Sequence, residues 1–239
     1  MSAPKILVPV NVSGDERPDP DLLELLHPVT VVLVGWHPVP DQTTLEQMKD
    51  EHEATAVERI ENVAAAFPDE QDIETLVVFT RDRTETVDRV ADDYDCDVVL
   101  VPEEVRVVER LLVPIRSDIN VDRIVSVVGA LLDENEASVT LFHAVRVDQE
   151  DPSVGDALLR GVADELSEAG VDRGRIDTVT VESQSPVDDI VDAAKNHDVL
   201  VVGETEPSLV EHILGDVPTK IIERSGRPVL VVRNVDDAD

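Results

Sequence analysis

The stretch Asp198-Val199-Leu200-Val201-Val202-Gly203 is a short apolar run that follows an aspartate and ends in glycine. Runs of this length, rich in β-branched residues, are typical of strands that are buried on both faces of a parallel sheet. A glycine directly after such a strand lets the backbone approach a phosphate group. The loop that follows carries Glu204, Glu206 and Asp216, however, and carboxylates repel phosphate. The stretch therefore predicts an α/β fold and leaves nucleotide binding as a question.

Similar apolar runs recur along the whole chain and alternate with amphipathic helical patterns. This alternation is typical of βαβ units, which build parallel sheets with helices on both faces. In the first half we expect strands at 5–12, 30–36, 73–80 and 97–102, and helices at 20–27, 44–66 and 84–94. In the second half we expect strands at 110–115, 138–145, 176–182, 198–202 and 228–233, and helices at 119–133, 153–169, 186–196 and 207–225. Gly170 and Gly226 are expected at the C-terminal ends of two of these helices.

The two halves repeat each other at an offset of roughly one hundred residues, the length of one small domain. The matching segments are Lys5-Ile6-Leu7-Val8-Pro9-Val10 with Arg110-Leu111-Leu112-Val113-Pro114-Ile115, and Asp97–Val101 with Asp198–Val202. The repeat breaks after Pro102, where the first half lacks the glycine loop, the last helix and the last strand. Val105–Val108 is a candidate for a short substitute strand. We predict a truncated domain at 1–108 and a complete domain at 109–239.

The charge of the chain is extreme. Of its 239 residues, 53 are acidic and 20 are basic, which gives a formal net charge of -33. Hydrophobic residues still make up 42%, so the acidity belongs to the surface of a folded protein. Scarce lysine and only 2% aromatic residues resemble the composition of halophilic proteins, with an ordinary acidic protein as the alternative. In both cases an anionic surface disfavours nucleic acid and anionic lipid as partners.

The sequence offers no pattern for metal binding or nucleophilic catalysis. The single cysteine, Cys96, excludes an intramolecular disulfide. The histidines do not pair at zinc-ligand spacing, and no Gly-x-Ser-x-Gly elbow occurs. His37 and His143 lie at matching strand ends, where packing is the expected role. We therefore predict a protein that is not an enzyme and has no metal site. With no signal pattern and no apolar run near ~18 residues, we expect it in the cytoplasm.

The segments quoted above resemble the universal stress protein (UspA-like) family, as does the closing stretch Arg227-Pro228-Val229-Leu230-Val231-Val232-Arg233. The likeness is to a tandem two-domain form from a salt-adapted, haloarchaeal-type organism. It implies two Rossmann-like, adenine nucleotide alpha hydrolase-like domains with parallel sheets and helices on both faces. It also implies that the two domains pair with each other, and that ATP is a ligand in some members of the family.

The positions that bind nucleotide in this family are altered here. Gly203 is kept, but Glu206 replaces the second glycine of the family's loop. Gly215 falls one residue early, and Asp216 replaces a hydroxyl residue. The resemblance thus implies a degenerate nucleotide loop in the second half.

The family's aspartate at the end of the first strand is replaced by Asn11 in the first half and by Arg116 in the second. Arg116 has three readings. In the favoured one it forms an ion pair with Glu204, Glu206 or Asp216 and fills the old site. In the second its planar guanidinium binds a phosphate or another anion. In the third it is an exposed side chain without a role.

We therefore expect a non-catalytic regulatory or stress-response protein with a degenerate nucleotide site. One alternative is an ATP- or AMP-binding protein with slow or no hydrolysis. Another is a cytosolic regulatory module of a membrane transporter. No cofactor is required, although ATP and AMP are candidates. The expected partners are the protein itself, through self-association or intrachain domain pairing, a small anionic ligand, and a transporter, but not nucleic acid.

Overall fold

The computed structural model describes residues 3–14, 17–68, 70–105, 107–117, 119–146, 152–204 and 216–234, except the side chains of 152 and 216–218. The elements of the first half are β1 (Lys5–Asn11), α1 (Pro20–Leu25), β2 (Thr30–Pro38), α2 (Leu45–Ala64), β3 (Ile73–Thr80), α3 (Arg83–Asp93) and β4 (Val98–Val101). Those of the second half are β5 (Arg110–Pro114), α4 (Val121–Leu132), β6 (Ser138–Arg146), α5 (Pro152–Glu168), a 3-10 turn η1 (Arg173–Arg175), β7 (Ile176–Ser183), α6 (Pro186–Ala194), β8 (Val199–Gly203), α7 (Asp216–Ser225) and β9 (Val229–Val232). The alternation of strands and helices predicted from the sequence is confirmed.

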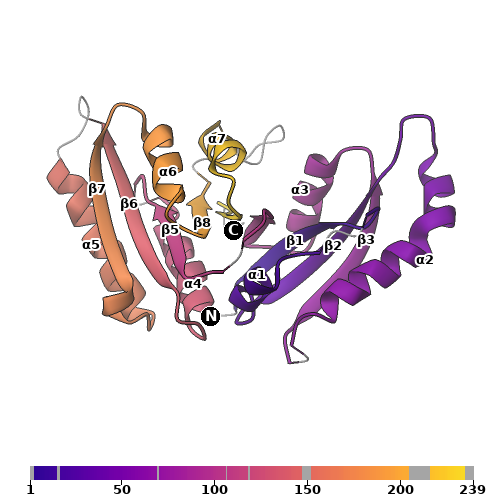
Figure 1. Ribbon diagram of the computed structural model, residues 1–239, viewed down its shortest axis with the longest axis horizontal. Helices are drawn as coiled ribbons and strands as arrows, with labels where there is room; N and C mark the ends of the chain where they lie inside the picture. Colours follow the sequence, from indigo (N-terminus) through magenta and orange to yellow (C-terminus); the bar gives the residue numbers. More distant parts are fainter. Residues whose placement is uncertain are drawn as a thin grey trace, which may run out of the picture.

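One nine-stranded sheet runs through both halves in the order β3-β2-β1-β4-β9-β8-β5-β6-β7. Every neighbouring pair is parallel except β4 and β9, which are antiparallel. Figure 1 shows the first half in indigo and magenta on the right and the second half in orange on the left. The predicted α/β fold is therefore correct, and the two halves share one continuous sheet.

The two halves use the same device to fix the first strand beside the fourth. In the first half, the Asp97 carboxylate accepts a hydrogen bond from the Lys5 backbone N–H at 2.9 Å. In the second half, the Asp198 carboxylate accepts one from the Arg110 N–H, also at 2.9 Å. The aspartate that precedes each buried run therefore sets the register of two neighbouring strands.

Alternate side chains of each strand enter separate cores on the two faces of the sheet. On one face, α1, α2, α4 and α5 pack over a single cluster that spans both halves. On the other face, α3 covers a cluster in the first half, while α6 and α7 cover one in the second. Leu111 and Val113 of β5, for example, face the first cluster, and Leu112 between them faces the α6–α7 side. This burial on both faces is why the strands read as continuous apolar runs.

The first half has no fifth strand of its own in the described residues, and β9 occupies that place. Val231 of β9 lies opposite Val99 of β4, in an antiparallel ladder that runs from Val98 to Val101. The expectation of a short strand at Val105–Val108 is wrong for the described positions, which are irregular. Val105 is instead buried in the shared core. The missing strand is therefore supplied by the other half of the chain.

Several helices begin at a capping side chain or end before a glycine. Thr44 and Asp82 cap α2 and α3 by accepting hydrogen bonds from the N–H groups of Gln47 and Glu85. Gly170 and Gly226 take positive φ angles of 107° and 58°, as residues after helices often do. The helix expected at 207–225 is described only from Asp216 onward. Among the described helices, none has the length and apolar character that a membrane span requires.

Candidate functional site

The carboxyl ends of β5 and β8 lie side by side and define the candidate site. The two strands are parallel neighbours, with Leu111 opposite Val199 and Leu112 opposite Leu200. Parallel sheets of this type bind ligands outside the carboxyl ends of their strands. Arg116, which follows β5, and Gly203, which ends β8, are thus brought to the same edge, as the family resemblance implied.

Gly203 lets α4 pack closely against the end of β8, and this requirement does not depend on a ligand. A Cβ at this position would lie 2.9 Å from Cδ1 of Ile124 on α4. It would also lie 3.6 Å from the Asn120 amide nitrogen. Real Cβ atoms do not approach carbon at 2.9 Å, so any side chain would push α4 away from the end of β8. The glycine is explained by this close contact without reference to a phosphate group.

Glu204 turns back toward the end of β9. Its N–H donates to the carbonyl oxygen of Val232 at 2.9 Å, and its carboxylate accepts a hydrogen bond from the Asn234 N–H at 3.0 Å. The residue is only 6% exposed, and its other carboxylate oxygen, Oε1, has no hydrogen-bond partner among the described residues. Burial raises the pKa of Glu204, against the lowering effects of the Asn234 hydrogen bond and of the Arg233 charge. The first residue of the loop is therefore a buried carboxylate.

The expected ion pair between Arg116 and Glu204 is not formed. The Arg116 side chain is exposed, while the Glu204 carboxylate is buried against Asn234. Of the other two candidate partners, Glu206 lies outside the described residues, as does Gly215. Asp216 is the first residue of α7, but its side chain is also outside them. The pairing of Arg116 with these two acids stays a prediction.

The corresponding position in the first half forms a simple turn. The Asn11 side-chain oxygen accepts hydrogen bonds from the Ser13 N–H at 2.9 Å and from the Ser13 hydroxyl at 2.7 Å. Such an Asx turn closes the chain on itself after β1.

Asn120 is a residue at this site that the sequence did not single out. It precedes α4 in a left-handed conformation, with φ of 63° and ψ of 13°. Its amide nitrogen donates to the Val232 carbonyl at 3.3 Å, and its side-chain oxygen is buried without a hydrogen-bond partner. Asparagine tolerates this conformation better than most residues. An asparagine directly before an apolar helix is therefore the sequence signal from which Asn120 could have been predicted.

The two histidines at matching strand ends have packing roles. Nδ1 of His143 lies 2.6 Å from the Ile115 carbonyl oxygen, and the ring packs against Gly155, where a Cβ would come within 2.5 Å of it. His37 stacks on His52 and on Phe79, with ring centroids 5.0 and 5.1 Å apart. Within the described part of the chain, no group of His, Cys, Asp or Glu side chains is arranged to hold a metal ion.

A second polar cluster lies at the junction of the two halves and was missed from the sequence. Arg233, directly after β9, is buried, and its guanidinium donates to the Cys96 carbonyl at 3.0 Å and to the Asp92 carboxylate on α3. Its backbone N–H donates to the Asp97 carbonyl at 2.9 Å. These partners lie more than a hundred residues away in the chain, so no local pattern could reveal them.

Asp88 on α3 faces the same junction. Burial raises its pKa to about 7, in spite of the opposing charge of Arg233. The nearby carboxylates of Asp92, Glu204 and Asp82 add to the rise. An aspartate in this setting titrates near neutral pH, unlike an aspartate in water.

Comparison with known proteins identifies the family. The model of the universal stress protein family matches residues 108–233, more than half of the chain. The chain belongs to the universal stress protein family. The match begins close to the predicted start of the second domain and ends with Arg233.

Solved structures agree on the fold. A universal stress protein from Archaeoglobus fulgidus is 15% identical, covers 99% of this chain and 98% of its own, and gives a TM-score of 0.67. The cytoplasmic domain of a prokaryotic cation chloride cotransporter is 12% identical over 98% of this chain and 96% of its own, with a TM-score of 0.50. A universal stress protein in complex with cAMP is 27% identical over 52% of this chain and 96% of its own, with a TM-score of 0.43. No curated protein matches the chain.

Proposed function

We propose that this universal stress protein is a non-catalytic regulatory protein whose second half carries a degenerate nucleotide site. The observation that carries the proposal is the buried Glu204 carboxylate, directly after Gly203 and beside the end of β9. A carboxylate about 4 Å from a phosphate repels it by a few kcal/mol at an effective dielectric of ~20. Arg116 is exposed and does not neutralise Glu204.

We further propose that the chain is a salt-adapted, cytoplasmic tandem of two stress-protein units. The shared strand register and the paired Asp97 and Asp198 contacts support two copies of one unit. The antiparallel ladder between β4 and β9 supports intrachain pairing of these units. The net charge of -33 supports the salt adaptation.

Titration calorimetry with ATP, ADP and AMP in molar KCl tests the nucleotide proposal. We expect no measurable binding by the wild-type protein at micromolar ligand. The double change Glu206→Gly and Asp216→Ser restores the family's residue types and should improve ATP binding, because it removes two carboxylates from the loop. Wild-type affinity in the low micromolar range would overturn the proposal in favour of the ATP- or AMP-binding alternative.

A second candidate function is that of a cytosolic module acting on a membrane transporter. It is favoured by the fold shared with the cotransporter domain over 98% of this chain. The test is fractionation of source-cell lysate in high salt. Recovery of the protein with the membrane fraction, and its release by detergent, would support this role. Recovery in the soluble fraction alone would count against it.

A further inference from the structure

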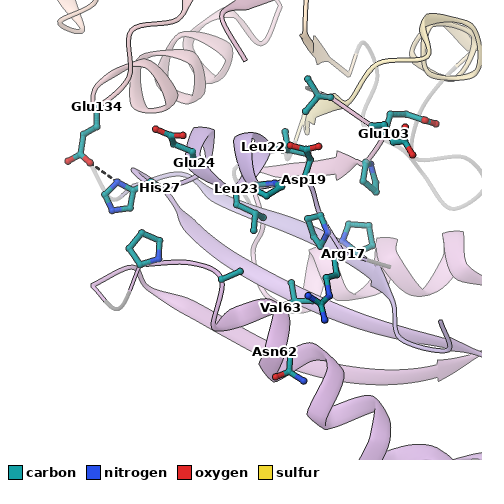
Figure 2. Close-up of a pocket in the computed structure, with 18 residues that line it drawn as sticks. Arg17, Asp19, Leu22, Leu23, Glu24, His27, Asn62, Val63, Glu103 and Glu134 are labelled. Atoms are coloured by element: carbon teal, nitrogen blue, oxygen red, sulfur yellow. Dashed lines mark ion pairs between the residues drawn. The ribbon is translucent and has the colours of Figure 1, made fainter. Parts of the chain in front are cut away.

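The first half contains a groove of about 1140 Å³. Figure 2 shows it beside α1, with lining residues from the C-terminal end of α2 and from the segment after β4. The accessible part of its apolar lining includes Pro18, Pro20, Ala66 and Pro68. We call this cavity the α1 groove.

The helix beside the groove is shorter than its counterpart in the second half. Pro9 of β1 corresponds to Pro114 of β5, since each sits at the same step of its ladder with the next strand. The helix that follows β5, α4, has 12 residues, whereas α1 has only 6. The difference amounts to more than one helical turn at 3.6 residues per turn. Arg17, Pro18 and Asp19, which precede the short helix, line the groove.

Carboxylates dominate the polar part of the α1 groove. Figure 2 shows Glu24, Asp19 and Glu103 spread along one side, while the Arg17 guanidinium points away from them toward Asn62.

Few of the charges in the groove are neutralised. Glu24, Glu103 and Glu104 make no ion pair within the ranges that the structure describes. His27 is paired with Glu134 at 2.8 Å, so it does not neutralise the others. The groove thus combines an apolar floor with a row of unpaired negative charges.

We propose that the α1 groove binds a linear aliphatic polyamine. Its ammonium groups would donate charge-assisted hydrogen bonds to the carboxylates along the wall. Its methylene segments would cover the apolar floor, as the stems of lysine side chains cover apolar surface. A nucleotide or another anion is repelled by the same carboxylates, and a bare metal ion gains nothing from the apolar floor. This site is separate from the Gly203 loop and does not depend on the function proposed for that loop.

The test is calorimetric titration of the full chain with spermidine in about 0.5 M KCl, where the Debye length is roughly 4 Å and diffuse attraction is screened. We expect one spermidine bound per chain. The double change Glu103→Gln and Glu104→Gln should weaken binding at least about tenfold, because charge-assisted hydrogen bonds are lost. The change Ala66→Trp, at an exposed lining position, should block binding by filling the groove.

The matched control is Glu165→Gln with Glu168→Gln, which removes the same charge from exposed positions of α5. It should bind spermidine like the wild type. Equal weakening in the control and the groove variant would show that spermidine acts only as a counterion, and would overturn the proposal. So would an equal response to ammonium chloride or MgCl₂ at matched ionic strength. If circular dichroism shows that Ala66→Trp does not fold, the comparison of the groove variant (Glu103→Gln with Glu104→Gln) and the control variant still decides the result.

Discussion

Arg233 is the residue on which the junction of the two halves depends most directly. It joins the end of β9 to the Cys96 carbonyl before β4 and to Asp92 on α3. Because the guanidinium is buried, its hydrogen bonds are not readily replaced by water. Burial also raises the pKa of the neighbouring Asp88 carboxyl group to about 7.

We expect Arg233→Met to lower the free energy of unfolding by about 2–3 kcal/mol, because the Cys96 carbonyl and the Asp92 carboxylate lose their charged donor. Chemical denaturation in molar KCl measures this loss. The control is Arg224→Met, which removes an exposed ion pair with Asp188 and should cost much less, because water screens the pair. Equal losses in the two variants would contradict a special role for Arg233.

Asp88 should make stability depend on pH. Its pKa is about 7 in the folded protein, well above the pKa of about 3.9 of an aspartate in water, so the native state favours the protonated form. The contribution of Asp88 to the free energy of unfolding is therefore most favourable below pH 3.8 and is lost as the pH rises toward 7. We expect Asp88→Asn to be more stable than the wild type at pH 8 by about 1–2 kcal/mol, a value reduced for partial solvent screening. The advantage should shrink toward pH 4.

Denaturation of both proteins across this pH range measures the effect, with Asp93→Asn on the exposed side of α3 as the control. The control should differ from the wild type by a similar amount at every pH. A difference between wild type and Asp88→Asn that does not change with pH would show that Asp88 is already ionised in the native state.

At the scale of elements, α4 packs closely against the end of β8. The expected Cβ contact of 2.9 Å at Gly203 involves the terminal methyl group of Ile124. We expect Gly203→Ala to lower the free energy of unfolding by about 1–3 kcal/mol through overpacking. Adding Ile124→Val removes the opposing Cδ1 atom and should recover part of the loss.

A double-mutant cycle on these two positions gives the coupling energy. The control is Gly161→Ala on α5, where nothing lies within 4 Å of the added methyl group. That change should be neutral or should stabilise by up to ~1 kcal/mol, because alanine favours the helix. Additive effects at Gly203 and Ile124 would argue against the steric explanation.

Elements were predictable from the sequence where burial on both faces produced continuous apolar runs. The runs around Val199–Val202 and Val229–Val232 both form strands. Val105–Val108 has a similar composition but does not form a strand in the described positions, because β9 already occupies the edge of β4. The local sequence does not show which distant strand pairs with the open edge of a sheet.

At the scale of the whole molecule, the net charge of -33 opposes the compact state. We expect the midpoint of thermal unfolding to rise by at least about 10 °C between roughly 0.1 M and 2 M KCl, because the Debye length falls from about 10 Å to below 3 Å. Circular dichroism at each salt concentration measures the midpoint. An uncharged osmolyte such as sucrose serves as the control and should give a smaller rise. A midpoint that does not change with KCl would favour the ordinary acidic protein.

The sequence by itself determined the fold class and the order of the elements. These properties depend on short-range patterns, such as apolar runs between amphipathic helices and an aspartate before each fourth strand. Only the tertiary structure decided that β9 completes the sheet of the first half, that Arg233 reaches Asp92, and that Glu204 turns toward Asn234 and away from Arg116. Each of these contacts joins residues far apart in the chain. These contacts form only where folding buries a particular carboxylate or strand beside a particular partner. The order of residue types along the chain does not fix that geometry.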